Sequence, residues 1–339
     1  MATSHLEYNE KTSATEVASA FASHIRDKNV VITGVGPNSL GEALALAIGS
    51  QKPRNLILAS RTKAKVQEVA AKVQDLSPET SVEAVVLNLA SQKSIHEAAS
   101  KIQSLADRVD TLINNAGMMV LERETTDEGI EVQFGTNHVG HFLFTNLLIP
   151  QLKNAAKVSG PGSTRIINVT SAGHRLSPVR FSDYNLEGKD VPIDERPPDG
   201  LPPMFSTTAE GYNGWLAYGQ SKTANILFTV YLSQHMASSG IVSYGVHPGS
   251  IWTGLSRGLD DIGYETMSKT SSFWKNADQG AATMLVAAYD PALKAVSDPS
   301  EVYLSDCQFA KTAPHAVNMD SAERLFHLSE KLVGIKFAL

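Results

Sequence analysis

Two patterns of apolar residues alternate along most of this chain. Short, nearly continuous apolar runs predict parallel strands that are covered on both faces. They span residues 29–33, 55–59, 82–87, 111–114, 165–170, 243–246 and 302–304. Segments with helical spacing lie between them, at residues 41–49, 63–74, 94–106, 129–152, 217–231 and 277–288. The alternation predicts an α/β fold, a single doubly wound domain with about seven parallel strands and helices on both faces.

Two segments depart from this alternation. Residues 1–27 precede the first strand and predict an appended extension with a helix around residues 15–26. Within residues 176–214, five of the fifteen prolines fall between Pro192 and Pro203, a density that disfavours helix and central strand alike. We therefore expect an irregular insertion there, within one domain that covers residues 28–339. Length alone would suggest two domains, but the alternation continues without a break to about Leu304.

Composition narrows the classes of partner. The net charge is −6 and the chain has no long basic run, so nothing in its charge points to nucleic acid or an anionic membrane surface as a partner. A single cysteine, Cys307, allows no internal disulfide and fits a reducing compartment. The longest apolar run, near residues 142–149, is too short to span a bilayer, and the first twenty residues are polar. We expect a cytoplasmic protein without a membrane span.

A tyrosine and a lysine stand four positions apart in the predicted helix at residues 217–231. Tyr218 and Lys222 would share one helix face, so the ammonium would lie beside the phenol. A neighbouring cation favours the phenolate and is expected to lower the pKa of the tyrosine, which makes the pair a usable acid and base. Such a pair is common on solvated helix faces, so its meaning depends on the rest of the chain.

The first predicted strand leads into a glycine-bearing turn and then a helix. Gly34 and Gly36 lie in the turn and Gly41 lies in the first turn of the helix. Glycines let a backbone approach a pyrophosphate closely, and the helix N-terminus offers N–H groups to an anion. In the first βαβ unit, this arrangement predicts a dinucleotide site.

The end of the second strand bears on the choice of dinucleotide. It reads Leu58-Ala59-Ser60-Arg61, with no carboxylate for the ribose 2′-hydroxyl of NAD. The guanidinium of Arg61 is instead suited to a 2′-phosphate, which favours NADP(H).

The order of these motifs identifies a family. With Thr33-Gly34 and Gly41, Asn114-Asn115-Ala116-Gly117, Ser171, Tyr218 and Lys222, and Pro248-Gly249, the chain resembles the short-chain dehydrogenase/reductase family over about residues 28–305. Residues 129–142 and 246–249 resemble its retinol-dehydrogenase-like branch, which includes WW-domain oxidoreductases and many fungal enzymes; no WW module is visible here. The resemblance implies a Rossmann fold.

The resemblance also implies roles for individual residues. Tyr218 would be the general acid and base, Ser171 would bind the substrate oxygen, and Asn137 would hold a water that relays protons to Lys222. Lys222 would also bind the nicotinamide ribose, and the segment at residues 248–253 the carboxamide. The implied cofactor contacts are Gly34, Gly36, Ser39, Leu40, Ser60, Arg61, Asn88, Leu89, Asn115, Ala116, Gly117, Tyr218, Lys222, Pro248, Gly249, Ile251 and Thr253.

The chain departs from the family pattern in two places. Ser39 replaces the middle glycine of the turn, and we expect its hydroxyl to donate to the pyrophosphate. Tyr218 follows Ser171 by 47 positions, an unusually long separation that implies an individual substrate pocket. A substrate lid is implied at about residues 250–276, and its apolar and aromatic residues favour a lipophilic or polycyclic substrate. These residues are Trp252, Leu255, Tyr264, Phe273 and Trp274.

The sequence therefore predicts an NADP(H)-dependent oxidoreductase that reduces a ketone or aldehyde of a lipophilic small molecule, as in secondary metabolism. Two alternatives remain open: a redox-neutral epimerase or dehydratase, and a protein that senses NADP(H) without turnover. No metal is expected, because no ligand cluster accompanies His138 and His141, and packing or loop roles are expected for these and for His174. A homodimer and a monomer both remain open, and the insertion would favour a monomer by covering a helix on which relatives dimerise.

Overall fold

A single eight-stranded sheet runs through the part of the chain that the structure, a computed structural model, describes: residues 1–207, 211–252, 254 and 259–339. Its strands are β1 (Asn29–Thr33), β2 (Asn55–Ser60), β3 (Ser81–Val86), β4 (Thr111–Asn114), β5 (Thr164–Val169), β6 (Ile241–His247), β7 (Tyr303–Ser305) and β8 (Gln308–Phe309). The order across the sheet is β3-β2-β1-β4-β5-β6-β7-β8. Strands β1 to β7 are parallel, which confirms the predicted fold, and the short β8 adds an antiparallel edge that was not predicted.

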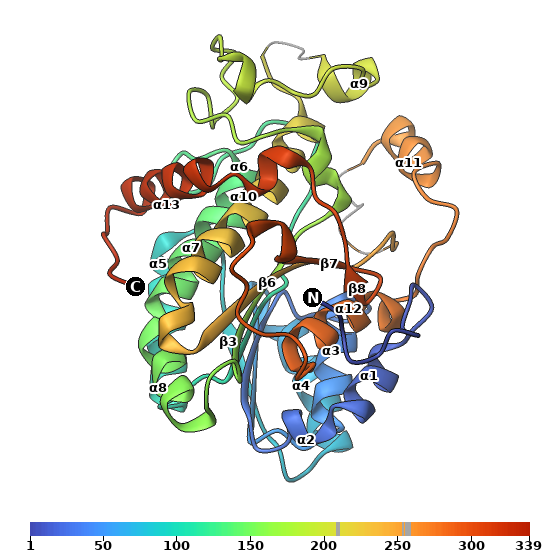
Figure 1. Cartoon of the computed structure of the whole chain (residues 1–339), viewed down its shortest axis with the longest axis vertical. Helices are drawn as coiled ribbons and strands as arrows, with labels where there is room; N and C mark the ends of the chain where they lie inside the picture. Colours follow the sequence, from blue (N-terminus) through green and yellow to red (C-terminus); the bar gives the residue numbers. More distant parts are fainter. Residues whose placement is uncertain (208–210, 253, 255–258) are drawn as a thin grey trace.

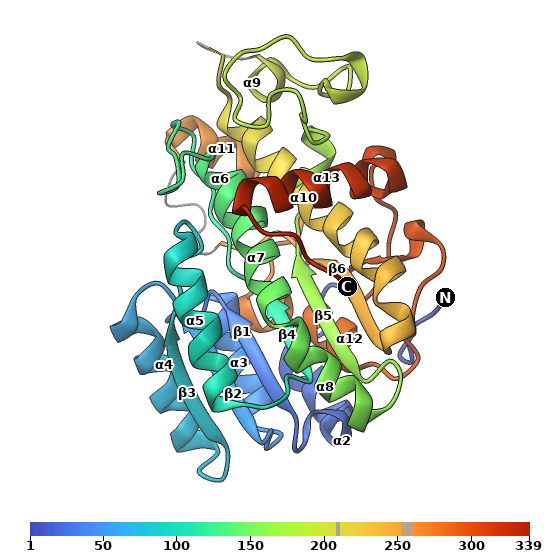
Figure 2. The same cartoon turned by 90° about the vertical axis from the view of Figure 1, so that its left-hand side faces the viewer.

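Helices cover both faces of the sheet (Figures 1 and 2). One layer contains α3 (Leu40–Gly49), α4 (Lys63–Leu76) and α12 (Ala277–Tyr289), and the other contains α5 (Gln92–Leu105), α7 (Gly140–Leu147) and α10 (Gly214–His235). The order of strands reverses between β1 and β4, and sheets of this kind bind their ligands beyond the carboxyl ends of the strands at such a point. The candidate functional residues gather at this edge of the sheet.

The predicted helix at residues 129–152 is interrupted. It divides into α6 (Val132–Phe134), a π-helical turn (Gly135–Val139), α7 and α8 (Ile149–Ser159). The π turn contains Asn137, one of the predicted catalytic residues. A single π turn within an α-helix often marks a functional site, because it shifts one residue out of the regular register.

The N-terminal extension packs against the first layer. It forms α1 (Ala14–Ala20) and α2 (Ala22–Ile25), which break at Phe21 within the predicted helical segment. The side chains of Val17 and Ala18 are buried in the main core beside α12 and α3. Upstream, the Ser4 hydroxyl donates to Asp290 at 2.5 Å, just beyond the end of α12. The extension is therefore an integral part of the packed fold.

A C-terminal helix that the sequence analysis missed, α13 (Met319–Val333), lies across α10 (Figure 2). Phe326 stacks on Tyr231 of α10, with ring centroids 3.9 Å apart. The hydroxyl of Ser329 lies 2.8 Å from Nε2 of His138. Helix α13 therefore covers part of α10.

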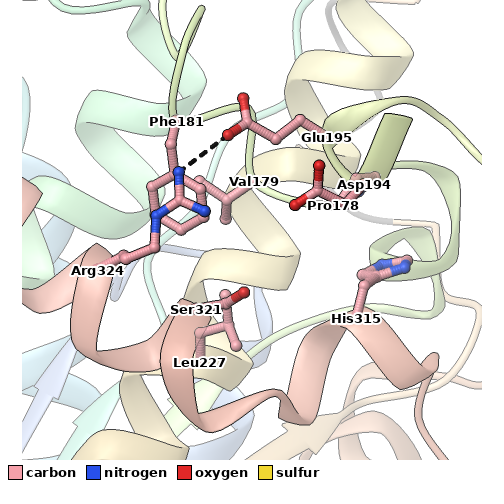
Figure 3. Close-up of a pocket in the computed structure, with 9 residues that line it drawn as sticks. All are labelled: Pro178, Val179, Phe181, Asp194, Glu195, Leu227, His315, Ser321 and Arg324. Carbon is pink, nitrogen blue, oxygen red and sulfur yellow. Dashed lines mark hydrogen bonds and ion pairs between the residues drawn. The ribbon is translucent and has the colours of Figure 1, made fainter. Parts of the chain in front are cut away.

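The insertion stands at the top of the molecule in Figure 1 and contains only short helical pieces among its described residues. They are a 3₁₀ turn (Ile193–Glu195) and α9 (Pro203–Ser206), and a further 3₁₀ turn (Ala172–Leu176) leads into the insertion. Buried Glu195 fixes the insertion to α13, because it accepts a hydrogen bond from Arg324 at 3.1 Å. The Arg324 guanidinium also lies 4.1 Å from the ring centroid of Phe181, and these groups line a crevice between insertion and helix (Figure 3).

Candidate active site

Helix α10 carries Tyr218 and Lys222 beneath the carboxyl edge of the sheet. Asn213 caps this helix, because its Oδ1 accepts hydrogen bonds from the N–H groups of Trp215 and Leu216 at 2.9 and 3.1 Å. The Lys222 ammonium lies 5.6 Å from the centroid of the Tyr218 ring. The two side chains therefore share a face as predicted.

The end of β5 places Ser171 against the tyrosine. Its hydroxyl accepts a hydrogen bond from the N–H of Gly173 at 3.1 Å, and a Cβ at Gly173 would lie 2.9 Å from the Tyr218 ring and 3.4 Å from Ser171 Oγ. The Lys222 ammonium donates to the carbonyl of Val169 at 3.2 Å, so the same strand end also holds the lysine. Three of the four predicted catalytic residues thus meet at one point.

Asn137 reaches the same region from the π turn. Its Oδ1 accepts the N–H of Met118 at 2.8 Å, and its Nδ2 donates to the carbonyl of Met118 at 3.0 Å and to Ser221 Oγ at 2.9 Å. Ser221 lies between the catalytic candidates of α10, so Asn137 joins that helix to the segment after β4. The predicted water relay through Asn137 stays a prediction.

Burial sets the protonation of both α10 residues. It lowers the pKa of the Lys222 ammonium to about 8. It also raises the pKa of the Tyr218 phenol, and the hydrogen bond with Ser171 opposes that rise. The expectation that the neighbouring ammonium would leave this tyrosine with a lowered pKa is therefore wrong for the chain without cofactor. The phenol keeps its proton at neutral pH.

The glycine turn and the segment after β4 lie side by side. Asn115 donates from Nδ2 to the carbonyl of Thr33 at 2.8 Å, and the N–H of Ala116 donates to the Thr33 hydroxyl at 3.0 Å. Gly34 has φ +75°, and a Cβ there would lie 2.6 Å from the Cα of Ala116, so glycine is required. By contrast, a Cβ at Gly36 would meet only Lys65, at 3.9 Å. The turn thus leaves open space for a ligand beside a helix N-terminus.

Gly117 links this turn to the catalytic candidates. A Cβ at this position would lie 3.3 Å from the Lys222 ammonium and 3.5 Å from Asn137 Oδ1. The segment of residues 115–117 therefore runs from the glycine turn to the lysine. An extended dinucleotide placed along it would have its phosphates at the turn and its other end near Tyr218. The residues present fit a nicotinamide dinucleotide.

Ser39 does not act as predicted. Its hydroxyl donates to the carbonyl of Gly36 at 2.7 Å and accepts the N–H of Glu42 at 3.2 Å. The single hydroxyl proton is used within the turn, so it is not available to a pyrophosphate. Ser39 is the N-cap of α3, which explains a serine in place of glycine. Leu40 follows it as the first residue of that helix.

The residues predicted to contact the adenine half of the cofactor lie at the ends of β2 and β3. The carbonyl of Ser60 accepts the N–H of Leu87 at 3.0 Å. Arg61 is exposed and makes no ion pair or hydrogen bond with any residue in the described part of the chain. The side chain of Asn88 accepts the N–H of Ala90 at 3.2 Å, and Leu89 is 6% exposed. Arg61 is therefore an unpaired cation at the place where a 2′-phosphate was expected.

The residues predicted to contact the nicotinamide half follow β6. Pro248 and Gly249 come directly after the strand, and Gly249 has φ +93°. Ile251 forms a parallel bridge with Lys275, and its side chain packs against Gly280 of α12. Thr253, the last predicted contact, lies outside the described residues.

Comparison with known proteins identifies the family. A profile of short chain dehydrogenases matches residues 28–185. Retinol dehydrogenase 13 of Homo sapiens is 33% identical over 314 residues, which make up 92% of this chain and 86% of that protein. The chain belongs to the short-chain dehydrogenase family. It is an oxidoreductase of that family, and the predicted likeness to the retinol-dehydrogenase-like branch is confirmed.

A fungal relative and a solved structure extend the likeness. Oxidoreductase fscI of Fusarium equiseti is 38% identical over 248 residues, which cover 72% of this chain and 95% of that protein. An uncharacterised protein from Mycobacterium paratuberculosis has the same fold, with a TM-score of 0.66 and 26% identity. That match covers 93% of this chain and 96% of the solved chain. As a short-chain dehydrogenase, the chain takes a nicotinamide cofactor.

Three histidines, His138, His141 and His174, have structural roles near the site of this short-chain dehydrogenase. His174 holds Ser171, because its Nδ1 lies 2.6 Å from the Ser171 carbonyl while its Nε2 accepts the N–H of Ala313 at 3.1 Å. This confirms the predicted loop hydrogen bond. Burial lowers the pKa of His138 to about 3 and that of His141 to about 4, so both are neutral packing residues. Across the described ranges, no three potential metal ligands lie together.

An apolar cluster surrounds the Tyr218 ring. Met119 and Trp215 are buried against it, and Phe205 of α9 meets Trp215 edge-to-face with centroids 5.1 Å apart. Other members come from the insertion, the segment after β4 and the lid: Leu121, Leu176, Met204, Leu259 and Met267. Sequence reasoning missed most of this cluster, because it assembles from segments that are far apart along the chain.

The insertion and the lid are joined above this cluster. The predicted lid contains α11 (Asp261–Ser268), and its Thr266 hydroxyl donates to the sulfur of Met204 at 3.4 Å. Asn213 fixes the other side, because its Nδ2 donates to the carbonyl of Met204 at 2.9 Å while its Oδ1 caps α10.

None of the described helices is long and apolar enough to cross a membrane.

Proposed function

We propose that this short-chain dehydrogenase is an NADP(H)-dependent reductase of ketones or aldehydes on lipophilic small molecules. The observation that carries the proposal is the meeting of Ser171, Tyr218 and Lys222 at the end of the segment from the glycine turn. An acid–base pair and a hydroxyl donor in that place are the groups that carbonyl reduction requires. A protein that only sensed the nucleotide would need none of them.

In this proposal, Ser171, Tyr218 and Lys222 each have a separate role in the reaction. When bound, the nicotinamide cofactor supplies the hydride. Tyr218 donates its proton to the substrate oxygen, and the Ser171 hydroxyl stabilises the negative charge that develops there. The raised pKa of Tyr218 keeps the phenol protonated at neutral pH, which suits the reductive direction. Lys222 is mostly charged at neutral pH, since its pKa is about 8, and its ammonium would favour the phenolate left after proton transfer.

NADP(H) is preferred to NAD(H) in this proposal because of Arg61. The guanidinium is exposed and has no partner among the described residues, so a phosphate would meet an uncompensated cation. No carboxylate follows β2 at residues 58–61 to accept a ribose 2′-hydroxyl.

The apolar cluster around Tyr218 supports a lipophilic substrate. Trp215 and Met119 pack in one buried cluster with Tyr218, and the partly buried side chains of Phe205, Met204 and Met267 extend this cluster. Methionine and aromatic side chains adapt to bulky apolar ligands, so this cluster supports a lipophilic substrate.

The test is oxidation of NADPH, followed by near-ultraviolet absorbance, against a panel of aldehydes, aromatic ketones and polycyclic ketones. Tyr218→Phe should abolish turnover while NADPH binding is retained. Tyr231→Phe is the matched control, because it makes the same change in a buried tyrosine of α10 that packs against α13. Retained binding with no turnover on any carbonyl would favour the redox-neutral or sensing alternatives instead.

A further inference from the structure

Lys275 closes the base of the lid. The chain leaves β6 at His247, turns at Gly249 and returns at Lys275, whose backbone N–H donates to the carbonyl of Ser250 at 2.9 Å. The bridge between Ile251 and Lys275 fixes the two ends of the lid together. The conformation of the turn after β6 therefore depends on where Lys275 lies.

The side chain of Lys275 is a buried charge that the proposed chemistry does not use. It is 2% exposed, and its ammonium pairs with Asp306 Oδ1 at 2.6 Å. Burying an ammonium costs several kcal/mol in the absence of excellent compensation, and an apolar side chain of similar volume often serves stability as well or better. A lysine at this place therefore calls for a reason beyond stability.

The stem of Lys275 fits directly under Gly249. A Cβ at Gly249 would lie 2.6 Å from Cε, 2.8 Å from Cδ and 3.0 Å from Nζ of the lysine. Because Gly249 also has φ +93°, both its backbone conformation and its contact with Lys275 exclude a side chain. The turn and the lysine are shaped to each other.

The carboxylate that holds the ammonium comes from an unusual turn. Asp306 and Cys307 connect β7 to β8 with φ values of +51° and +65°, a left-handed conformation that non-glycine residues rarely adopt. Thr283 of α12 supports the second residue, because its Oγ1 accepts the N–H of Cys307 at 3.1 Å. The turn thus presents Asp306 to Lys275 from a fixed position. Strained backbone of this kind concentrates at functional sites.

We propose that Lys275, held by Asp306, is a positioning residue for the nicotinamide half of the cofactor. Its stem and ammonium hold Gly249 in the conformation that receives the carboxamide. This inference rests on the proposed function, in which Pro248 and Gly249 contact that group. The lysine itself does not touch the reacting atoms.

The test separates the two halves of the cofactor. Lys275→Met keeps the volume of the stem and removes the ammonium. We expect the Kd of NADPH, measured by fluorescence titration, to rise about tenfold or more, as for loss of a hydrogen-bonded charge. The Kd of adenosine 2′,5′-bisphosphate, which lacks the nicotinamide half, should not change in calorimetry. Asp306→Asn, at a side chain that is 48% exposed, should give the same pattern because it removes the charge that holds the ammonium.

Lys269→Met is the matched control. Lys269 pairs with Glu265 at the same 2.6 Å distance within the lid, but the two side chains are 72% and 69% exposed. It should leave both affinities unchanged. Equal weakening of both ligands by Lys275→Met, or no weakening of NADPH, would overturn the inference while the proposed function stood. If the unaltered chain bound neither ligand, the proposed function itself would fail.

Discussion

Gly173 leaves just enough room for the Tyr218 ring, and filling that room should disable the site without unfolding the chain. A Cβ at this position would lie 2.9 Å from Cε1 and 3.0 Å from Cδ1 of the tyrosine, and 3.4 Å from Ser171 Oγ. Ordinary carbon–carbon contacts lie at about 3.5–4.0 Å, so Gly173→Ala must displace the ring or the turn by about half an ångström. Its backbone has no left-handed φ, so the methyl group is the only perturbation.

The displacement can be converted into an expected effect. Overpacking by one methyl group costs about 1–3 kcal/mol, which is a modest loss for a domain of this size. Helix α10 is buried almost throughout and cannot move as a whole, so the tyrosine ring takes up the change. A misplacement of this order in a catalytic group lowers kcat by about 10- to 100-fold. The turn at Gly34 and Gly36, where the phosphates of the cofactor are expected, is not altered by this substitution, so NADPH affinity should stay nearly constant.

The assay compares kcat, the Kd of NADPH and the thermal unfolding midpoint for Gly173→Ala and for Ala172→Ser. The control adds one heavy atom to the same 3₁₀ turn at an exposed position. We expect a large loss of kcat in the first variant alone. If Gly173→Ala retained full activity with a normal unfolding midpoint, the inferred contact with Tyr218 would not limit the chemistry, and the reasoning would be refuted.

Three further predictions address the cofactor and the substrate. Arg61→Ala should reduce the preference for NADPH over NADH by about 10- to 100-fold, as expected for loss of a charge-assisted hydrogen bond. The control Lys63→Ala should leave this preference unchanged, and equal effects of the two variants would show that Arg61 does not bind the 2′-phosphate. Burial lowers the pKa of Lys222 to about 8, so its ammonium loses a proton as the pH rises through that value. NADPH affinity should therefore fall above about pH 8, and an affinity that does not change with pH would contradict the role of Lys222 in binding the cofactor. Phe205→Ala should raise KM for polycyclic ketones by about 3- to 10-fold and leave small aldehydes unaffected, because an aromatic contact with Trp215 is lost. Ile193→Ala, at an 84% exposed position of the same insertion, should change neither KM, and parallel behaviour of the two variants would exclude α9 from the substrate site.

The central sheet was predictable because its strands are buried on both faces and therefore leave unbroken apolar runs. The predicted positions of β1 and β4 match the structure, and the other predicted strands are displaced by no more than about two residues. Strand β8 has two residues, and the turn before it is formed by Asp306 and Cys307 without glycine, so no turn signal marked it. Helix α13 does show apolar spacing and an N-cap at Asn318, which could have revealed it.

The site divides in a similar way. Residues such as Tyr218 and Lys222 were found because their spacing within one helix already implies proximity. Lys275 was not found, since an isolated lysine gives no sign of burial until the fold brings Asp306 and Gly249 to it. Ser39 was noticed but misinterpreted, because its hydrogen bonds depend on the local path of the turn. The sequence around a residue therefore predicts its chemical role more readily than it predicts which residues it will contact in the fold.

The double role of Asn213 bears on how this chain can vary over evolution. One end of its side chain fixes the start of the catalytic helix, and the other end holds the insertion at Met204. Residues upstream of that joint can therefore drift, lengthen or exchange apolar groups while the first turn beside Tyr218 stays in place. Descendants of this protein could acquire new substrates by changes confined to the insertion, with the reaction itself inherited intact.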